Sequence, residues 1–147
     1  EINLPLDSIR VGKDFMRNHP DALDLFIHEG SPIYNMSSGI VVLAEDGWKE
    51  ESPLSTSSYR GGNTVIVYNP TKKEFYRYAH LDKVLVKSGD IIDMKEIIGG
   101  VGHTGMNASK PGHGEHLHLE INRYDNNKKE IKSLSAREIK MRIDNIK

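Results

Sequence analysis

Residues 115–121 read Glu-His-Leu-His-Leu-Glu-Ile, in which polar and apolar side chains alternate with the period of a β-strand. In a strand, His116 and His118 project from one face together with Glu120, while the three aliphatic side chains project from the other face into a core. The segment therefore predicts a half-buried strand that carries two imidazoles about 6–7 Å apart on its polar face. The alternative interpretation is an amphipathic strand with two ordinary surface histidines.

Short strand-like runs separated by turn-forming residues make up most of the remaining chain. The candidate strands are residues 39–44, 63–69, 74–80, 83–86, 96–100 and 115–122. Several short strands at this spacing predict a mainly β fold, a small antiparallel β-sandwich or open barrel. Residues 46–60 are polar and rich in serine, so we expect a long surface loop there.

The C-terminal segment has the pattern of a helix, predicted over residues 135–146. Ser135 and Glu138 match the Ser-x-x-Glu capping box of a helix N-terminus. Apolar side chains then recur at helical spacing, at Ile139, Ile143 and Ile146. A terminal helix packed against the sheet is the simplest interpretation.

Length and composition restrict the function classes. The chain has 147 residues, enough for one domain with its own core. Its 20 basic and 21 acidic residues are balanced and form no basic stripe, which argues against a nucleic-acid partner. No apolar run approaches the roughly 20 residues that cross a bilayer. The absence of cysteine excludes disulfides, thiol catalysis and cysteine-based metal sites.

Histidines and one aspartate supply the donors of a candidate metal site. A catalytic zinc site needs three nitrogen or oxygen ligands from the protein and one open position. His19 and Asp24 precede an apolar stretch and could join one histidine of residues 115–121, with Glu120 accepting the other ring N–H of that histidine. Taken alone, residues 18–21 (Asn-His-Pro-Asp) are also typical of an ordinary turn.

A third histidine ends the run Tyr-Arg-Tyr-Ala-His at residues 76–80. Strict alternation places Tyr76, Tyr78 and His80 on one face of their strand. A histidine at a strand end could reach the same cleft, and Tyr78 could line it. A partly buried structural histidine is the alternative.

The order of these motifs resembles the lysostaphin/LytM-type peptidases. A His…Asp pair is followed by Tyr-Ala-His-Leu, a glycine-rich stretch and His-Leu-His. Further segments resemble family motifs, namely residues 30–41, 62–67, 86–99 and the Gly-x-Thr-Gly turn at 102–105. The resemblance covers about residues 19–122 and leaves 123–147 as a C-terminal extension of a single domain over residues 1–147.

The resemblance implies a zinc metalloendopeptidase that cuts bacterial peptidoglycan in an extracytoplasmic location, periplasmic or secreted. Matched by position, His19, Asp24 and His118 would bind one zinc ion, and His80 and His116 would form the catalytic pair. His116 would act as general base, and His80 would donate to the oxyanion or to the leaving amine. No His-Glu-x-x-His motif is present, so a thermolysin-like site is not expected.

Two features depart from the family pattern. The family spaces its first ligands as His-x-x-x-Asp, whereas four residues separate His19 from Asp24. A β-bulge could absorb the extra residue, or another group could replace His19, with His28 the nearest rival. The segment before His-x-His is also expanded, and we expect its His113 to be a loop residue.

Other function classes remain open at this stage. A catalytically inactive member of the same family would bind peptidoglycan or a partner without cutting it. A biotinyl or lipoyl carrier would present Lys95, which follows Met94 in a turn. A phosphotransfer protein with paired histidines would not need Asp24.

Overall fold

The structure is a computed structural model that describes residues 1–49, 61–105, 108–109 and 114–146. The described residues form α1 (Phe15–Asn18), β1 (Leu23–Phe26), β2 (Pro32–Tyr34), β3 (Gly39–Glu45), β4 (Asn63–Asn69), β5 (Glu74–Val84), β6 (Ile91–Ile92), β7 (Ile97–Val101), β8 (His116–Asp125), β9 (Glu130–Ser133) and α3 (Ala136–Asp144). Most of the expected loop at 46–60 lies outside the described residues, and so does His113.

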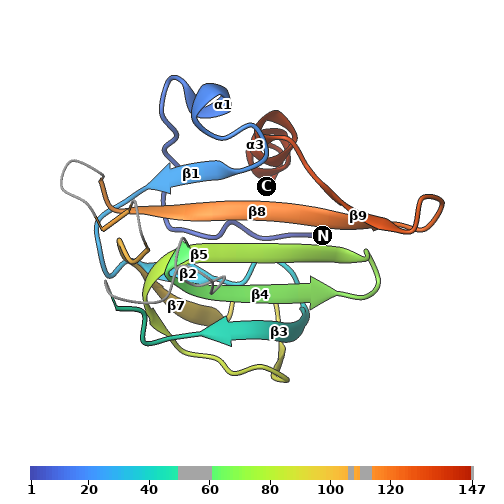
Figure 1. Cartoon of the computed structure of the whole chain (residues 1–147), viewed down its shortest axis with the longest axis horizontal. Coiled ribbons are helices and arrows are strands. Elements are labelled where there is room, and N and C mark those ends of the chain that lie inside the picture. The colour runs from blue at the N-terminus through green and yellow to red at the C-terminus, as the bar shows by residue number, and fades with distance from the viewer. Residues whose placement is uncertain (50–60, 106–107, 110–113, 147) are drawn as a thin grey trace.

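The strands form one antiparallel sheet that folds back on itself. Its main path runs β1-β8-β5-β4-β3-β6, while β7 pairs with both β5 and β2 and β9 pairs with β8. Figure 1 shows β2 and β7 behind β4 and β5, so that the sheet encloses the core as an open barrel. The prediction of a mainly β, antiparallel fold with a C-terminal helix is confirmed.

Alternating side chains build the core in the way that the sequence of β8 predicts. Leu117, Leu119 and Ile121 are fully buried, and they meet Leu23 and Leu25 of the neighbouring β1. This buried face holds β8 at the centre of the molecule, between β1 and β5. The opposite face of the same strands is left to carry polar side chains.

One predicted pair of strands is a single strand. Residues 74–80 and 83–86 were expected to be separate, but β5 continues from Glu74 to Val84. Up to Ala79 it pairs with β8, and from Leu81 onward it pairs with β7. The strand therefore changes partners without ending, which lets one strand join two parts of the curled sheet.

The C-terminal helix α3 begins at its predicted cap. The Ser135 side chain accepts a hydrogen bond from the Glu138 backbone, and the Glu138 side chain reaches back to the Ser135 backbone. Ile139 and Ile143 are buried against the core, and the helix ends at Asp144, two residues before the predicted end. Among the described residues, no helix is long and apolar enough to cross a membrane.

Candidate metal and catalytic site

The pairing of β1 with β8 brings an aspartate onto the polar face of β8. Asp24 is the cross-strand partner of His118, and Phe26 is the partner of His116. Directly opposed residues on neighbouring strands point to the same face. Asp24 Oδ1 lies 3.1 Å from His118 Nδ1 and 3.8 Å from His116 Nε2. Two segments far apart in the sequence thus form one polar cluster.

His19 reaches this cluster from the turn between α1 and β1. Its Nε2 lies 3.1 Å from Asp24 Oδ2, and its side chain is 44% exposed, so the cluster opens to solvent on this side. The turn is anchored by the Ala136 backbone N–H at the start of α3, which donates to the Pro20 carbonyl at 2.7 Å. The helix at the far end of the chain therefore fixes the position of His19.

The additional residue between His19 and Asp24 is not absorbed by a β-bulge. Residues 23–26 pair with β8 in unbroken register, and the chain between His19 and Leu23 forms a turn. The prediction of a bulge is therefore wrong, because the turn takes up the extra length before the strand begins. His28 does not replace His19, since it lies beyond the end of β1 in a separate pocket.

His19, Asp24 and His118 fit a metal ion. One ligand atom from each of them lies within 4.8 Å of the others. Zinc–ligand distances near 2.0–2.2 Å put neighbouring ligand atoms of a tetrahedral site about 3.4 Å apart. The two imidazole nitrogens each lie 3.1 Å from Asp24, His19 from its Oδ2 and His118 from its Oδ1. Two imidazoles and one carboxylate are a donor set that zinc accepts, and the fourth position of such a site is left for water.

Glu120 orients the histidine at the centre of the cluster. Its Oε2 lies 2.9 Å from His118 Nε2, which therefore carries a proton, while Nδ1 lies 3.1 Å from Asp24 Oδ1. A bound metal would displace any proton on Nδ1, and this nitrogen would then be the ligand. Arg77 on β5 donates to the same carboxylate at 2.6 Å. Burial acts to raise the pKa of Glu120, but the His118 hydrogen bond and the charge of Arg77 outweigh it and lower that pKa.

The charges in the cluster are mutually stabilised. Burial opposes ionisation of Asp24, but the His118 hydrogen bond and the three neighbouring imidazoles lower its pKa. Burial also disfavours the charged form of His118, whereas Asp24 and Glu120 raise its pKa. A carboxylate ionised at neutral pH, held against imidazoles, is a polar centre ready for a cation.

A β-bulge turns His80 toward the cluster. Asn63 pairs with Leu81 and Val65 pairs with Tyr78, so one residue of β4 lies opposite two residues of β5 between these pairs. The strand β5 therefore holds one additional residue at this point. His80 has φ 65°, a left-handed backbone that is unusual for any residue but glycine. Its ring lies 5.0 Å from the ring of His116 and 5.5 Å from that of His118.

The prediction that Tyr76, Tyr78 and His80 share one face is wrong. Both tyrosines are fully buried on the core side, and the Tyr78 hydroxyl accepts a hydrogen bond from the Met36 backbone N–H. The bulge moves His80 to the opposite face, because it interrupts the alternation after Tyr78. Tyr78 therefore does not line the cleft.

Backbone carbonyls set the proton positions of His80 and His116. His80 Nδ1 lies 2.6 Å from the Thr104 carbonyl, and His116 Nδ1 lies 2.8 Å from the Gly114 carbonyl. A carbonyl only accepts, so each Nδ1 carries a proton and each neutral ring keeps a lone pair on Nε2. Burial, followed by the neighbouring His116 and His118, lowers the pKa of His80 to about 4. Both rings can therefore accept a proton, and each becomes a donor once it has done so.

Thr104 holds the backbone next to His80. The sequence indicated only that Thr104 belongs to a Gly-x-Thr-Gly turn, and it gave no sign of this role. Its hydroxyl donates to the Leu81 carbonyl at 2.7 Å and accepts from the Asn63 backbone N–H at 3.0 Å. The Asn63 side chain also donates to Leu81, at 3.0 Å. These bonds hold the backbone at Leu81, the residue that follows His80 in the bulge.

Replacing Thr104 by valine should release the proton position of His80. Valine keeps the shape but removes the hydroxyl, so two hydrogen bonds are lost at a cost of about 1–3 kcal/mol, and the Thr104 carbonyl is no longer held against Nδ1. We expect ¹⁵N NMR of the imidazoles to show the Nδ1–H form of His80 in the wild type and a mixture of tautomers in Thr104→Val. Thr104→Ser, which keeps the hydroxyl, should retain the wild-type spectrum. Equal spectra for the valine and wild-type proteins would contradict this role of Thr104.

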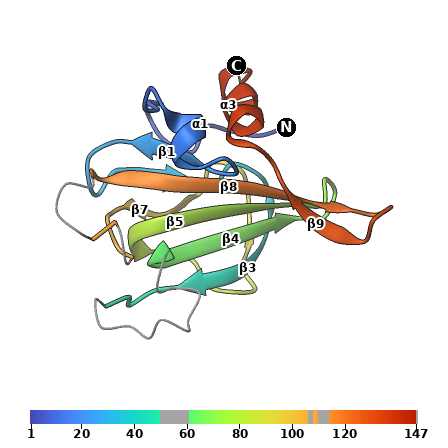
Figure 2. The same ribbon diagram turned by 45° about the horizontal axis from the view of Figure 1, so that its top comes forward.

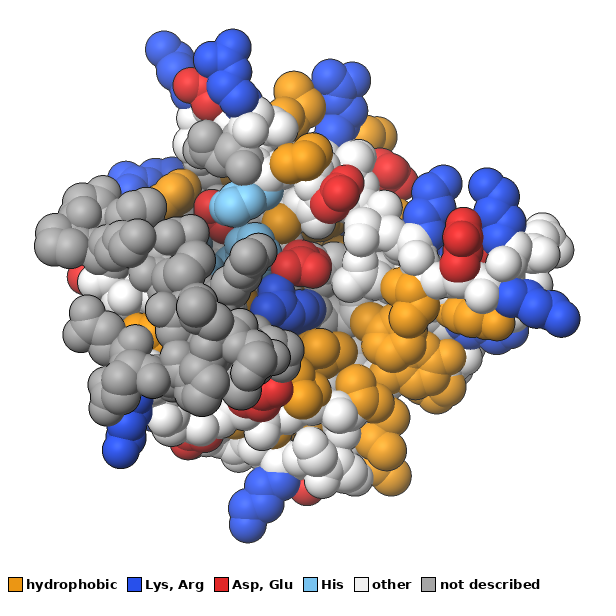
Figure 3. All heavy atoms as spheres, in the orientation of Figure 1, with side chains coloured by type: hydrophobic (Ala, Val, Ile, Leu, Met, Phe, Trp, Pro, Cys, Tyr) orange, Lys and Arg blue, Asp and Glu red, His pale blue; other side chains and the backbone are white. Residues whose placement is uncertain are grey.

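The remaining described histidines lie outside the cluster. His103 pairs with Glu29, and His28 lines a pocket beyond β1. The cluster itself reaches the surface as histidine side chains beside acidic and basic ones (Figure 3). An apolar hollow of about 330 Å³ continues from Arg77 along the same face, lined by Val42, Leu43, Ile66, Phe75 and Ile131.

Comparison with known proteins identifies relatives of the chain. The chain is 33% identical to lysostaphin of Staphylococcus simulans over 106 residues, which are 71% of this chain and 18% of that protein. It is 30% identical to the peptidoglycan DD-endopeptidase ShyA of Vibrio cholerae over 128 residues, 80% of this chain and 26% of that protein. It thus spans about a fifth to a quarter of the length of these relatives.

A solved structure shows the same fold. The catalytic domain of lysostaphin from Staphylococcus simulans superposes with a TM-score of 0.56 and 26% identity, over 93% of this chain and 84% of that domain. The sequence profile of peptidase family M23 matches residues 18–132, which include every residue of the metal and histidine cluster. The chain therefore belongs to peptidase family M23.

Proposed function

We propose that the chain is a zinc-dependent endopeptidase that hydrolyses peptide bonds in the stems or crosslinks of bacterial peptidoglycan. The observation that carries the proposal is the His19–Asp24–His118 ligand cluster with two further imidazoles beside it. The relatives named as lysostaphin and as a peptidoglycan DD-endopeptidase support the substrate class. Peptidoglycan lies outside the cytoplasmic membrane, so we expect the protein to be periplasmic or secreted.

The proposed chemistry divides the work between ligands and proton carriers. Zinc held by His19, Asp24 and His118 would lower the pKa of water and polarise the carbonyl of the bond to be cut. His116 Nε2 faces this cluster and takes a proton from the attacking water as general base. His80, once protonated at Nε2, donates to the developing oxyanion or passes its proton to the leaving amine. Where His80 supplies the proton of the amine, it takes that proton from solvent, and His116 releases the proton of the water to solvent; where His80 only stabilises the oxyanion, His116 passes the proton of the water to the amine.

The test is a digest of purified peptidoglycan by the zinc-loaded protein, with and without a chelator. We expect fragments that appear only without chelator, and their masses identify the bond that is cut. A matched digest with the His116→Ala variant controls for a contaminating hydrolase.

An inactive, binding-only member of the family is the competing function. It is less well supported, because each ligand and catalytic position carries a competent residue and the rings of His80, His116 and His118 are in contact. It predicts zinc binding and sedimentation with peptidoglycan but no fragments from several wall types, and this result would refute the endopeptidase. A carrier of biotin or lipoate at Lys95 or a phosphotransfer protein would leave the metal ligands unexplained.

A further inference from the structure

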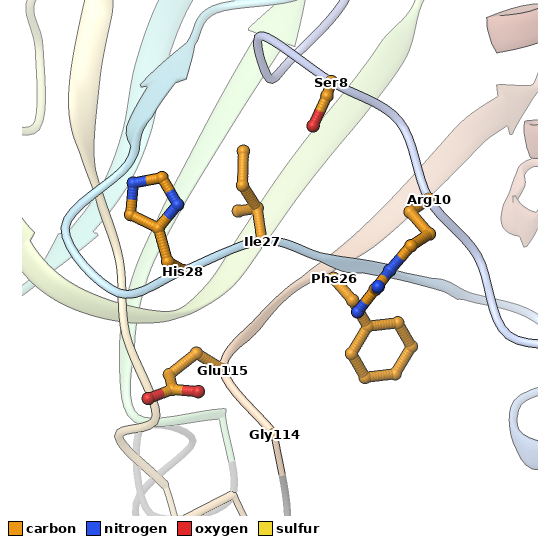
Figure 4. A pocket seen from close by; sticks show the side chains of 7 residues that line it. All are labelled: Ser8, Arg10, Phe26, Ile27, His28, Gly114 and Glu115. Carbon is orange, nitrogen blue, oxygen red and sulfur yellow. The ribbon is translucent and has the colours of Figure 1, made fainter.

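A pocket of about 380 Å³ lies beside the catalytic cluster and is built from three separate segments. Ser8 and Arg10 come from the segment before α1, residues 26–28 from the end of β1, and residues 114–115 from the approach to β8. Figure 4 shows Arg10 and Glu115 on opposite sides of this pocket, with Ile27 between them. We refer to it as the Arg10 pocket. Its volume suits one amino-acid residue of a longer ligand.

The Arg10 pocket shares two walls with the catalytic cluster. Phe26 in its lining is the cross-strand partner of His116, and the two rings lie 5.5 Å apart. Gly114, also in the lining, supplies the carbonyl that binds His116 Nδ1. A peptide whose bond is cut at His116 would therefore extend into this pocket with a neighbouring residue.

The charges of the pocket are opposite and unpaired. Among the residues that the structure describes, neither the Arg10 guanidinium nor the Glu115 carboxylate forms an ion pair, although both line the same pocket. The Arg10 carbonyl accepts a hydrogen bond from the Phe26 N–H at 2.9 Å, which fixes the backbone of Arg10 against β1. Phe26 and Ile27 provide apolar surface in the same lining.

This pattern selects a ligand that carries both charges. A lone carboxylate would be attracted by Arg10 and repelled by Glu115, and a lone ammonium would meet the reverse. A group with both charges pairs with each, and a guanidinium binds a carboxylate through two parallel hydrogen bonds. An aliphatic arm that carries the group would lie on Phe26 and Ile27.

We propose that the Arg10 pocket is a substrate subsite for a residue whose aliphatic side chain ends in a zwitterionic amino-acid group. The proposal rests on the proposed endopeptidase function. Arg10 lies before residues 18–132, the part of the chain that matches the family profile. The subsite combines Arg10 with residues inside the matched range, and it determines which peptides are bound well.

The test compares three peptides that differ at one residue, which is 2,6-diaminopimelate, lysine or norleucine. Diaminopimelate has the carboxylate and the ammonium, lysine has only the ammonium, and norleucine has neither. For the wild type we expect KM to be about tenfold lower for the diaminopimelate peptide than for the lysine peptide, as fits a charge-assisted hydrogen bond. The value of kcat should be similar for the two.

Variants assign each charge to its residue. Arg10→Ala should remove the preference for diaminopimelate over lysine, and Glu115→Gln should raise KM for the diaminopimelate peptide about tenfold while leaving KM for the norleucine peptide unchanged. Lys13→Ala and Glu130→Gln change exposed charges outside the pocket and should retain the wild-type order. Equal KM values of the wild type for the diaminopimelate and lysine peptides, or equal losses for both peptides in Arg10→Ala, would overturn the proposal.

A binding measurement separates this proposal from the endopeptidase function. Free 2,6-diaminopimelate, titrated into the zinc-loaded protein, should shift the NMR signals of the Phe26 and Glu115 amides, and Arg10→Ala should abolish the shifts. If no peptide is cut but these shifts occur, the proposed endopeptidase function is wrong, while the Arg10 pocket is still a binding site for the zwitterionic group. If peptides are cut and the shifts are absent, the proposed subsite is wrong and the endopeptidase function stands.

Discussion

The His116→Ala variant should lose peptide hydrolysis by about 10²–10⁴-fold and keep its zinc, whereas His118→Ala should lose both. The reason is geometric. His118 presents Nδ1 to Asp24 within the ligand cluster, with Nε2 held by Glu120. His116 is held by the Gly114 carbonyl, and its Nε2 remains 3.8 Å from Asp24. One ring thus belongs to the candidate ligand cluster, while the other lies beside it with a lone pair on Nε2.

The measurement pairs the zinc content of each purified variant with its rate on peptidoglycan fragments. Loss of a side chain that is hydrogen-bonded to a metal ligand costs roughly 10–100-fold in metal affinity, and loss of a ligand itself costs more. We therefore expect His118→Ala and Asp24→Ala to be isolated without zinc, and His19→Ala to bind it weakly. Equal zinc loss in His116→Ala and His118→Ala would contradict the division of roles. Intact zinc affinity in His19→Ala would remove His19 from the ligands.

The Glu74→Gln variant should be about 3 kcal/mol less stable than the wild type at pH 7. Glu74 is buried, with 2% of its side chain exposed, and accepts hydrogen bonds from three side chains. The Tyr76 hydroxyl donates at 2.7 Å, and Arg123 of β8 and Arg142 of α3 each approach to 2.7 Å. Glutamine removes the charge and leaves two guanidinium groups without their partner. Because Glu74 links β5 to β8 and to the C-terminal helix, we expect the variant to lower the stability of the whole domain and not only of one strand.

The same carboxylate makes the wild type sensitive to acid. Burial acts to raise the pKa of Glu74, but the hydrogen bonds of Arg142, Tyr76 and Arg123 lower it from 4.5 to about 2. A depressed pKa in the folded state contributes stability above pH 4.5, and this contribution is lost as pH falls toward 2. The stability of the wild type should therefore decline through this window, and Glu74→Gln should decline less.

Urea unfolding at pH 7 and at pH 3 measures both effects. Glu130→Gln on the exposed strand β9 is the matched control, and we expect it to stay within about 0.5 kcal/mol of the wild type. A loss of about 3 kcal/mol corresponds to a fall in Tm of roughly 10 °C for a domain of this size. If Glu74→Gln had the same free energy of unfolding as Glu130→Gln, the ion pairs of Glu74 would contribute nothing to stability.

Local patterns were sufficient for the half of the site that lies on β8. Alternation along residues 115–121 places two histidines and Glu120 on one face, and the structure has them there. The capping box at Ser135 located the start of α3 for a similar reason, since its hydrogen bonds join residues three apart. The ordered motifs also indicated that His19, Asp24 and His80 belong with them, although not how they reach them.

The rest depended on contacts between distant segments. The turn that carries His19 is fixed by the Ala136 N–H at the other end of the chain, and four-residue β1 becomes a strand because β8 is available to pair with it. Thr104 and the pocket of Arg10 and Glu115 likewise bring together residues that no local period connects.

His80 shows the difference most clearly. Sequence alternation placed it on the same face as Tyr78, which the structure buries in the core, and a single additional residue in β5 puts it on the opposite face, beside His116. The left-handed backbone that this requires costs about 1–3 kcal/mol for a residue other than glycine. Hydrogen bonds to Asn63 and Thr104, which lie 17 and 24 residues from His80 along the chain, offset that cost. The sequence by itself determined which histidines are candidates and which strand carries His116 and His118. Tertiary structure decided which way His80 points, because the alternation of a strand holds only where its pairing with the neighbouring strand is unbroken.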